Sequence, residues 1–323
     1  MKKLLLLAGI TLGLVTAPVH AQMTFRLGHV VNEQANHHVL ATHFKDALEH
    51  LSDGELQVDI YCCGQLGGGE REQIELTQFG EIDVFSGSTG ALGGFVPAVN
   101  VFDLPFLFRD NDHVDAVIEG PIGRGILDQA EQADLKGLAF AENGWRNLTN
   151  SRRPVNQAAD AAGLRLRTME NRVHLDAWRA LGVNATPMSW GEVRNALQQA
   201  VIDGQENPVN IIHSFSLWEV QDYLSMTRHV FSPSVLLMNL DLYNELTTQQ
   251  QDWIMQAAAE ASRAERDWIR DNEAQMLDEI EQYMQVNHNP EMDSFRAAMR
   301  PVFEQYESVF GAELINAIVN EGL

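Results

Sequence analysis

The feature that most constrains the fold of this chain is a repeated alternation of strand patterns and helical patterns. The segments 25–30, 56–61 and 82–86 read as strands, and the segments between them, 36–51 and 70–78, read as helices. Such alternation is typical of an α/β sheet whose strands are joined by crossover helices. In these sheets ligands bind outside the carboxyl ends of the strands, near a topological switch point.

Three loops at the strand ends are therefore candidates for a ligand-binding site, at 29–32, 68–70 and 86–90. His37 opens the helix beside the first of them and is a candidate for lining a ligand cleft. A metal site at the histidines is not expected, since no carboxylate or thiolate stands at ligand spacing from them. Glu170 and His174, four residues apart on a predicted helix, are interpreted as a surface pair.

The second half of the chain contains the segment Gly-Leu-Arg-Leu-Arg, which ends at Arg167. Its alternation predicts a strand that places Arg165 and Arg167 on one face and the leucines on the other. A guanidinium presents a planar fork of donors, which suits bidentate binding of a carboxylate. The alternative is that these arginines are solvated or pair with acids of the chain itself.

The composition restricts the possible partners. The chain has 45 acidic and 22 basic residues and a formal net charge of −23. Such an acidic surface argues against nucleic acid, anionic membranes and polyanions as partners. Two alternative explanations of this charge are left open, a saline habitat and compositional drift.

The first 21 residues have the pattern of a cleaved secretory signal. Lys2 and Lys3 precede an apolar run at 4–15, and small residues end at Ala21. The run is shorter than the roughly 20 apolar residues that a membrane span needs. We therefore expect a soluble protein that works in the periplasm.

Eight short motifs occur in order along the chain, and together they resemble the solute-binding proteins of TRAP transporters, the DctP type. They are QLGGGERE from Gln65, STG at 88–90, FDLPFLFRD at 102–110, GWRNLTNS at 144–151, GLRLR at 163–167, TPMSWGEV at 186–193, DGQENP at 203–208 and WEVQDYLSMTRH at 218–229. The resemblance covers essentially the whole mature chain.

The resemblance implies a fold, an α/β clamshell of the periplasmic-binding-protein type with two lobes. Each lobe is a mixed sheet flanked by helices. The implied divisions are a signal peptide at 1–21, lobe I at 22–143 and 233–272, and lobe II at 144–232 and 273–323.

A long helix should span both lobes. No proline or glycine occurs from Thr248 to about Asn287, and Thr248 is the expected N-cap. Two helices with an uncapped join are the alternative. The remainder, 292–319, is expected to be helical and to dock on lobe II.

Carried over by position, the resemblance also implies site residues. Arg167 is the expected contact for a ligand carboxylate. Arg146 and Asn207 match further recurrent contacts, and Trp190 matches an aromatic position that lines the pocket.

Other positions are less firmly aligned. Glu70 and Ser88 match loop positions that contact the variable part of the ligand, although an extra glycine near Glu70 shifts that alignment by one. Ser88 replaces a residue that is acidic in sialic-acid-binding members, which counts against sialic acid. Phe215 is a possible pocket wall, and a core role is equally open.

The function that follows is capture of an organic acid and its delivery to a TRAP membrane permease. Dicarboxylates, sugar acids, aromatic or keto acids and ectoine are all bound by relatives, and a sugar acid is preferred here. The alternative is a clamshell binding protein that serves an ABC importer or a sensor.

No hydrolase, zinc-protease, P-loop or dinucleotide motif is present in the sequence, so an enzyme is not expected. We expect a monomer without cofactor or metal and without nucleic-acid partners.

The signal pattern predicts cleavage after Ala21, because that alanine ends the small-residue segment. The intact mass of protein isolated from the periplasm should correspond to a chain that begins at Gln22. A chain that still begins at Met1, or that stays in the membrane fraction, contradicts this prediction.

Overall fold

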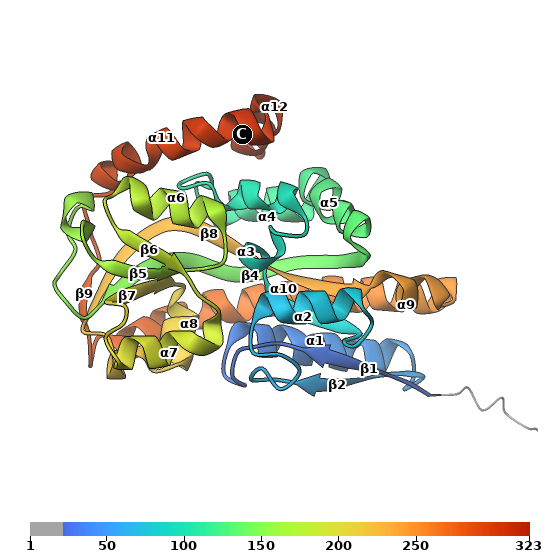
Figure 1. Ribbon diagram of the computed structural model, residues 1–323. Coiled ribbons are helices and arrows are strands. Elements are labelled where there is room, and N and C mark those ends of the chain that lie inside the picture. The colour runs from blue at the N-terminus through green and yellow to red at the C-terminus, as the bar shows by residue number, and fades with distance from the viewer. Residues whose placement is uncertain (1–21) are drawn as a thin grey trace, which may run out of the picture.

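The computed structural model describes residues 22–323, and the predicted signal segment with its cleavage site lies outside the described residues. Nine strands form one mixed sheet in the order β2-β1-β3-β8-β4-β7-β5-β6, and β9 pairs with β8 (Figure 1). The strands are β1 (Met23–Gly28), β2 (Leu56–Tyr61), β3 (Val84–Ser88), β4 (Leu135–Asn150), β5 (Arg165–Thr168), β6 (Asn184–Pro187), β7 (Gly204–Asn207), β8 (Tyr223–Asn239) and β9 (Gln285–Asn287).

Twelve α-helices accompany the described strands. They are α1 (Asn36–Leu51), α2 (Glu70–Gln78), α3 (Thr89–Leu92), α4 (Asn111–Glu119), α5 (Pro121–Leu127), α6 (Arg172–Ala180), α7 (Trp190–Gln198), α8 (Val209–Ser214), α9 (Leu240–Glu245), α10 (Thr248–Ile280), α11 (Met292–Phe310) and α12 (Ala312–Asn320). The α/β class is confirmed, and α1, β2 and α2 match the predicted segments at both ends. Between β4 and β5 the chain forms only a short 3₁₀ turn, Ala158–Ala161.

Two long strands, β4 and β8, connect the two halves of the sheet. They pair antiparallel from Leu135 opposite Asn239 to Asn150 opposite Tyr223. One end of β8 pairs with β3, whereas the opposite end of β4 pairs with β7. We call the part with β1–β3 the first half, the part with β5–β7 the second half, and the β4–β8 pair the ribbon. In Figure 1 the ribbon crosses the whole width of the molecule.

The helix α10 contacts both halves. It packs against α1 in the first half, against α8 in the second, and against β4 between them (Figure 1). The expectation of one long helix is confirmed, but it ends at Ile280, and the chain then enters the short strand β9. The predicted cap at Thr248 is wrong, because the side chain of Thr247 accepts the capping hydrogen bond from Gln250.

The C-terminal helices lie along one edge of the molecule. The helix α11 packs against α6 of the second half. The end of α12 instead contacts α4 and the residues before it. Arg109 donates to the carbonyls of Val319 and Glu321, and the Nε2 of His113 lies 2.6 Å from the carbonyl oxygen of Ile318. The C-terminal segment therefore contacts elements that flank both halves.

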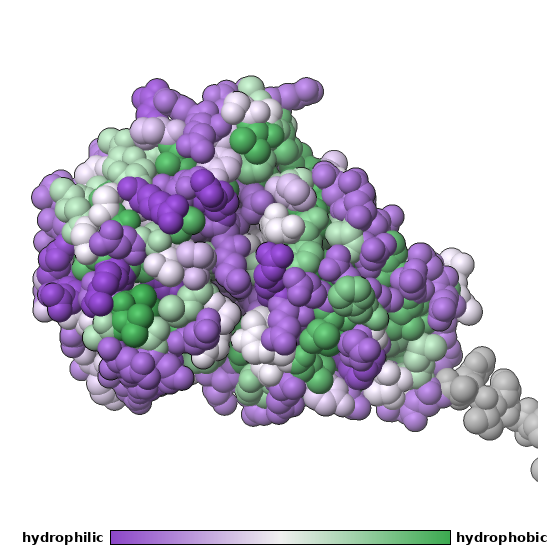
Figure 2. All heavy atoms as spheres, in the orientation of Figure 1, coloured by the Kyte–Doolittle hydropathy of each residue, from purple (hydrophilic) through white to green (hydrophobic). Residues whose placement is uncertain are grey.

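The apolar side chains of the strands and the facing helices form the core. In the first half, Phe25 and Leu27 of β1 pack with Leu40 and Phe44 of α1. Figure 2 shows a largely hydrophilic face with hydrophobic residues in small separate groups. Within residues 22–323, no helix has both the length and the apolar character that a bilayer crossing requires.

The capping geometry of α10 gives a testable difference between two neighbouring threonines. Thr247→Ala should lower the free energy of unfolding by about 1 kcal/mol, because it leaves the amide of Gln250 without its capping oxygen. Thr248→Ala is the matched control and should change stability little, since Ala is a better helix former at the first helical position. Urea unfolding of both variants checks this, and an equal loss in both would contradict the assignment.

Candidate ligand-binding site

A small cavity of about 20 Å³ lies where the two halves of the sheet meet. Residues from the first half, the ribbon and the second half all line it: Val30, Val31, His37, Glu70, Ser88, Asn143, Arg146, Arg167, Met169, Trp190, Asn207 and Ile211. The first-half contributors follow the carboxyl ends of β1, β2 and β3, as the sheet argument predicts.

Seven of the eight residues singled out from the sequence lie in this cavity. They are Arg167, Arg146, Asn207, Trp190, Glu70, Ser88 and His37. Phe215 does not line it, and its ring instead packs edge-on against Trp190 at a centroid distance of 4.9 Å. Phe215 therefore holds the cavity wall in place from behind.

Arg146, on β4, is a buried member of an ion pair. Its Nε lies 2.5 Å and its Nη2 2.8 Å from the carboxylate oxygens of Glu206, and both side chains are fully buried. Burial opposes the charge of Glu206, but Arg146 and two neighbouring histidines hold its pKa well below the usual range. The positive charge of Arg146 is thus compensated within the protein. Its Nη1 has no hydrogen-bond partner among the described residues.

Arg167, at the end of β5, differs from Arg146 in having no carboxylate partner in the described chain. Its Nε donates to the carbonyl of Met188 at 2.9 Å, and its guanidinium lies over the Trp190 ring, 5.6 Å from the centroid. These two contacts fix the plane of the guanidinium. Its terminal nitrogens make no hydrogen bond to any described residue. Burial and the nearby Arg146 lower the pKa of Arg167 to about 10, so it stays charged at neutral pH.

Arg165, two residues earlier on β5, has a different environment. Its guanidinium is largely exposed and pairs with Asp203, with Nη2 2.6 Å from the carboxylate. The alternation expected of the segment is present, since Leu164 and Leu166 are buried. Only the second of the two arginines reaches the cavity.

The opposite wall of the cavity carries an acid and a neutral histidine. The carboxylate of Glu70 accepts a hydrogen bond from the backbone amide of Ser88 at 2.7 Å, and burial raises the pKa of this carboxyl group. Burial, and secondarily His29, lower the pKa of His37 to about 3, so its ring is neutral. Neither ring nitrogen of His37 has a hydrogen-bond partner among the described residues. On this wall the ring nitrogens of His37 are therefore available to hydrogen-bond a ligand, beside the carboxyl group of Glu70.

Asn207 and Ser88 are largely engaged by the protein. The Oδ1 of Asn207 accepts from Arg146 at 3.2 Å, and its Nδ2 donates to Gln205. The hydroxyl of Ser88 accepts from the amide of Gly90 and lies 3.3 Å from the hydroxyl of Ser232. Both residues therefore shape the cavity and also support their neighbours.

His174 is a component that sequence reasoning missed. The surface pair expected with Glu170 is wrong, because His174 is buried and lies between two other acids. Its Nε2 is 2.9 Å from Asp103, and its Nδ1 is 3.5 Å from Glu206. Burial lowers its pKa, but the two carboxylates outweigh burial and raise the pKa to about 9. A charged His174 therefore links the segment before α4 to the Arg146–Glu206 pair.

Other lining residues gave no separate signal in the sequence. Asn143, Met169 and Ile211 lie in the cavity wall beside the predicted motifs. Their positions become evident only when the ribbon brings distant segments together. Within the described part of the chain, no group of three His, Cys, Asp or Glu residues is placed to hold a metal ion.

Comparison with known proteins identifies the family of this chain. Residues 27–309 match the family described as "Bacterial extracellular solute-binding protein, family 7", DctP. The chain belongs to this family of TRAP-type solute-binding proteins, whose members bind a solute rather than transform it.

Two solved structures and one further relative illustrate the similarity. A TRAP periplasmic solute-binding protein from Polaromonas sp. JS666, bound to D-erythronate, is 39% identical with a TM-score of 0.91, covering 94% of this chain and 100% of that one. The sugar-acid-binding protein of Advenella mimigardefordensis, in complex with galactonate, is 32% identical with a TM-score of 0.89, covering 93% and 97%. The 2,3-diketo-L-gulonate-binding periplasmic protein of Escherichia coli is 30% identical and covers 92% of each chain.

The raised pKa of His174 predicts a pH dependence of stability. In the unfolded chain the pKa is near 6.5, so between pH 6.5 and about 9 the folded protein holds a proton that the unfolded chain has lost. The stabilisation is complete below pH 6.5 and disappears as the pH rises through about 9. Its size is on the order of a few kcal/mol, since one pKa unit corresponds to about 1.4 kcal/mol.

His174→Gln should remove this dependence. Urea unfolding at pH 6.5 and pH 9.5 should show a larger loss of stability in the wild-type protein than in the variant. Glu265 and Glu142, whose buried carboxyl groups also have raised pKa values, titrate in both proteins and cancel in the comparison. Equal losses in the two proteins would contradict the assignment of a charged His174.

Proposed function

We propose that this protein captures a small hydroxy monocarboxylate of the sugar-acid type in the cavity and delivers it to a TRAP membrane permease. The observation that carries the proposal is the guanidinium of Arg167. It is buried, charged and held in plane by Met188 and Trp190, yet no carboxylate of the described chain pairs with it. A ligand carboxylate supplies the missing partner through two parallel hydrogen bonds.

The charges around the cavity favour one ligand carboxylate over two. Arg146 is already paired with Glu206, whereas Arg167, the other arginine of the wall, has no ion-paired carboxylate among the described residues. Glu70 faces the same cavity and disfavours a second carboxylate at its end, because like charges repel in a desolvated site. The unpartnered nitrogens of His37 and the carboxyl group of Glu70 instead suit ligand hydroxyl groups. The relatives that bind erythronate and galactonate support this ligand class.

Binding in this cavity requires the two halves to move. Its free volume of about 20 Å³ is close to that of a single water, so a ligand enters only when the walls separate. Hydrogen bonds from Asn171 to Gly90 and Asp103 join the second half to the first beside the cavity. We assign residues 22–143 with 233–272, and 144–232 with 273–323, to two lobes that close on the ligand.

The membrane partner and the location follow from the family. Relatives are periplasmic proteins of TRAP systems, and the N-terminal signal pattern accords with export. Delivery to a TRAP permease is therefore favoured over delivery to an ABC importer or a sensor.

A thermal-shift screen of organic acids tests the ligand class. Four- to six-carbon aldonates should stabilise the protein more than succinate or malate do at equal concentration. A ligand at 100 times its Kd adds about 2.7 kcal/mol to the free energy of unfolding. Stabilisation by dicarboxylates alone would overturn the monocarboxylate assignment.

Arg167→Lys should then weaken binding of the identified acid by about ten- to a hundredfold, although the formal charge is kept. A lysine cannot reproduce the bidentate fork, and a hydrogen bond to a charged group is worth about 1.5–3 kcal/mol. Arg167→Ala should weaken binding further than Arg167→Lys does. Titration calorimetry measures both.

Arg165→Ala is the matched control on the same strand, because its partner Asp203 lies outside the cavity. It should bind the ligand with nearly wild-type affinity. If Arg165→Ala abolishes binding while Arg167→Lys binds normally, the proposed carboxylate contact is wrong. Circular dichroism confirms that each variant is folded.

A further inference from the structure

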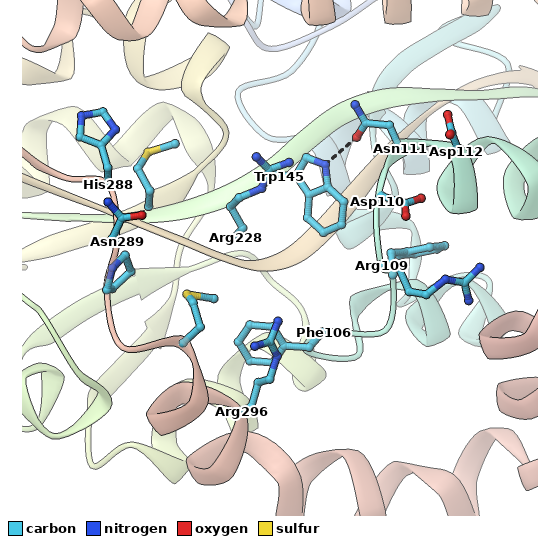
Figure 3. Close-up of a pocket in the computed structure, with 14 residues that line it drawn as sticks. Phe106, Arg109, Asp110, Asn111, Asp112, Trp145, Arg228, His288, Asn289 and Arg296 are labelled. Atoms are coloured by element: carbon cyan, nitrogen blue, oxygen red, sulfur yellow. Dashed lines mark hydrogen bonds between the residues drawn. The ribbon is translucent and has the colours of Figure 1, made fainter.

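A large hollow in the described part of the molecule is separate from the ligand cavity. It is an open groove of about 650 Å³, lined by the segment 106–112, by the ribbon residues Trp145, Met226 and Arg228, and by the segment 288–296 (Figure 3). Trp145 lines this groove, whereas the next residue on β4, Arg146, lines the cavity. Because successive residues of a strand point to opposite faces, the groove and the cavity lie on opposite faces of the ribbon.

Arg228 is held in the groove without a carboxylate partner among the described residues. Its guanidinium lies over the ring of Trp145, 5.0 Å from the centroid, and the indole nitrogen of Trp145 donates to Asn111 at 2.7 Å. The backbone of Arg228 has a φ of 40°, in the left-handed region that non-glycine residues rarely adopt. Its side chain makes no hydrogen bond to the described chain, and its backbone amide donates to the side-chain oxygen of Asn147 at 3.1 Å.

Arg296 occupies a comparable position on another wall. Its guanidinium lies over the ring of Phe106, 5.2 Å from the centroid, and Figure 3 shows both across the groove from Arg228 and Trp145. Its one carboxylate contact, to the fully exposed Asp293, is 3.4 Å long. Two guanidinium groups are thus held by their faces on aromatic rings, which leaves most of their N–H edges unused.

The other charged residues of the groove are more fully occupied or lie at the rim. Arg109 donates to the carbonyls of Val319 and Glu321. The carboxylate of Asp110 caps α4 by accepting from the amide of His113. Asp112 is exposed on α4. Arg228 and Arg296, both exposed, are therefore the basic residues of the groove whose guanidinium groups are least occupied by the protein.

We infer that this groove is a second ligand site, which binds an oxyanion, a carboxylate or a phosphate, between Arg228 and Arg296. Arginine forks match the oxygen geometry of both groups. The chain has about twice as many acidic as basic residues, yet in this groove Arg228 has no carboxylate partner among the described residues and Arg296 has only the 3.4 Å contact to Asp293. The long-range field of the chain opposes anions, and binding therefore depends on short contacts in the groove.

Two probes test this site, inorganic phosphate and citrate, each titrated at constant ionic strength. The readout is the indole N–H signal of Trp145 in ¹⁵N-labelled protein, identified by its loss in Trp145→Phe. Saturable shifts are expected in the millimolar range or below. Shifts with citrate alone assign the site to carboxylates, and shifts with phosphate alone assign it to phosphates. The same titration of Arg167→Ala should give unchanged affinity, since that variant alters only the cavity.

Arg228→Gln and Arg296→Gln should each lower the affinity for the bound probe by about tenfold or more. Arg300→Gln, one turn further along α11 and paired with Glu304, is the matched control and should bind as the wild type does. Failure of both probes to saturate, or binding with wild-type affinity by both glutamine variants, overturns the inference. Loss of binding in Arg167→Ala places the probe in the cavity instead, which also overturns it but leaves the proposed function intact.

Discussion

The buried ion pair between Arg146 and Glu206 is the interaction on which the site depends. Two charges removed from water are tolerated only when further hydrogen bonds satisfy them. Asn207 supplies one, and His174 and His229 lie within 3.5 Å of the Glu206 carboxylate. This arrangement anchors the ribbon to β7 beneath the cavity. It also pairs the charge of Arg146, which leaves Arg167 as the proposed contact for a ligand carboxylate.

The three arginines of this region show how environment separates side chains of one type. Arg146 is buried with a partner, Arg165 is exposed with a partner, and Arg167 is buried without one in the described chain. The third arrangement is the one that suits the proposed ligand contact, because a buried and unpaired charge gains most from a new partner. The aromatic ring of Trp190 lies against that guanidinium and restricts its orientation.

Much of this could be predicted from the sequence. Periodicity located α1, β2 and α2 to the residue, because local apolar spacing determines such elements. The motifs contain six of the seven predicted residues that line the cavity, and His37 was inferred from the position of the first loop. They could not reveal that Arg146 is neutralised or that His174 is buried, since those depend on partners 60 and 71 residues away in the chain. The cap at Thr247 rather than Thr248 depended on backbone geometry that two adjacent threonines do not distinguish.

The continuity of the ribbon limits how this architecture can be divided. The first half completes its sheet with residues 234–238 of β8, and the second half completes its own with residues 147–150 of β4. Each strand runs on without interruption into the other half. Any cut between the halves therefore leaves both fragments with unpaired strand edges, which are prone to aggregate. Such a protein recombines poorly by exchange of whole halves, and new specificities are expected to arise by point substitution in the cavity wall.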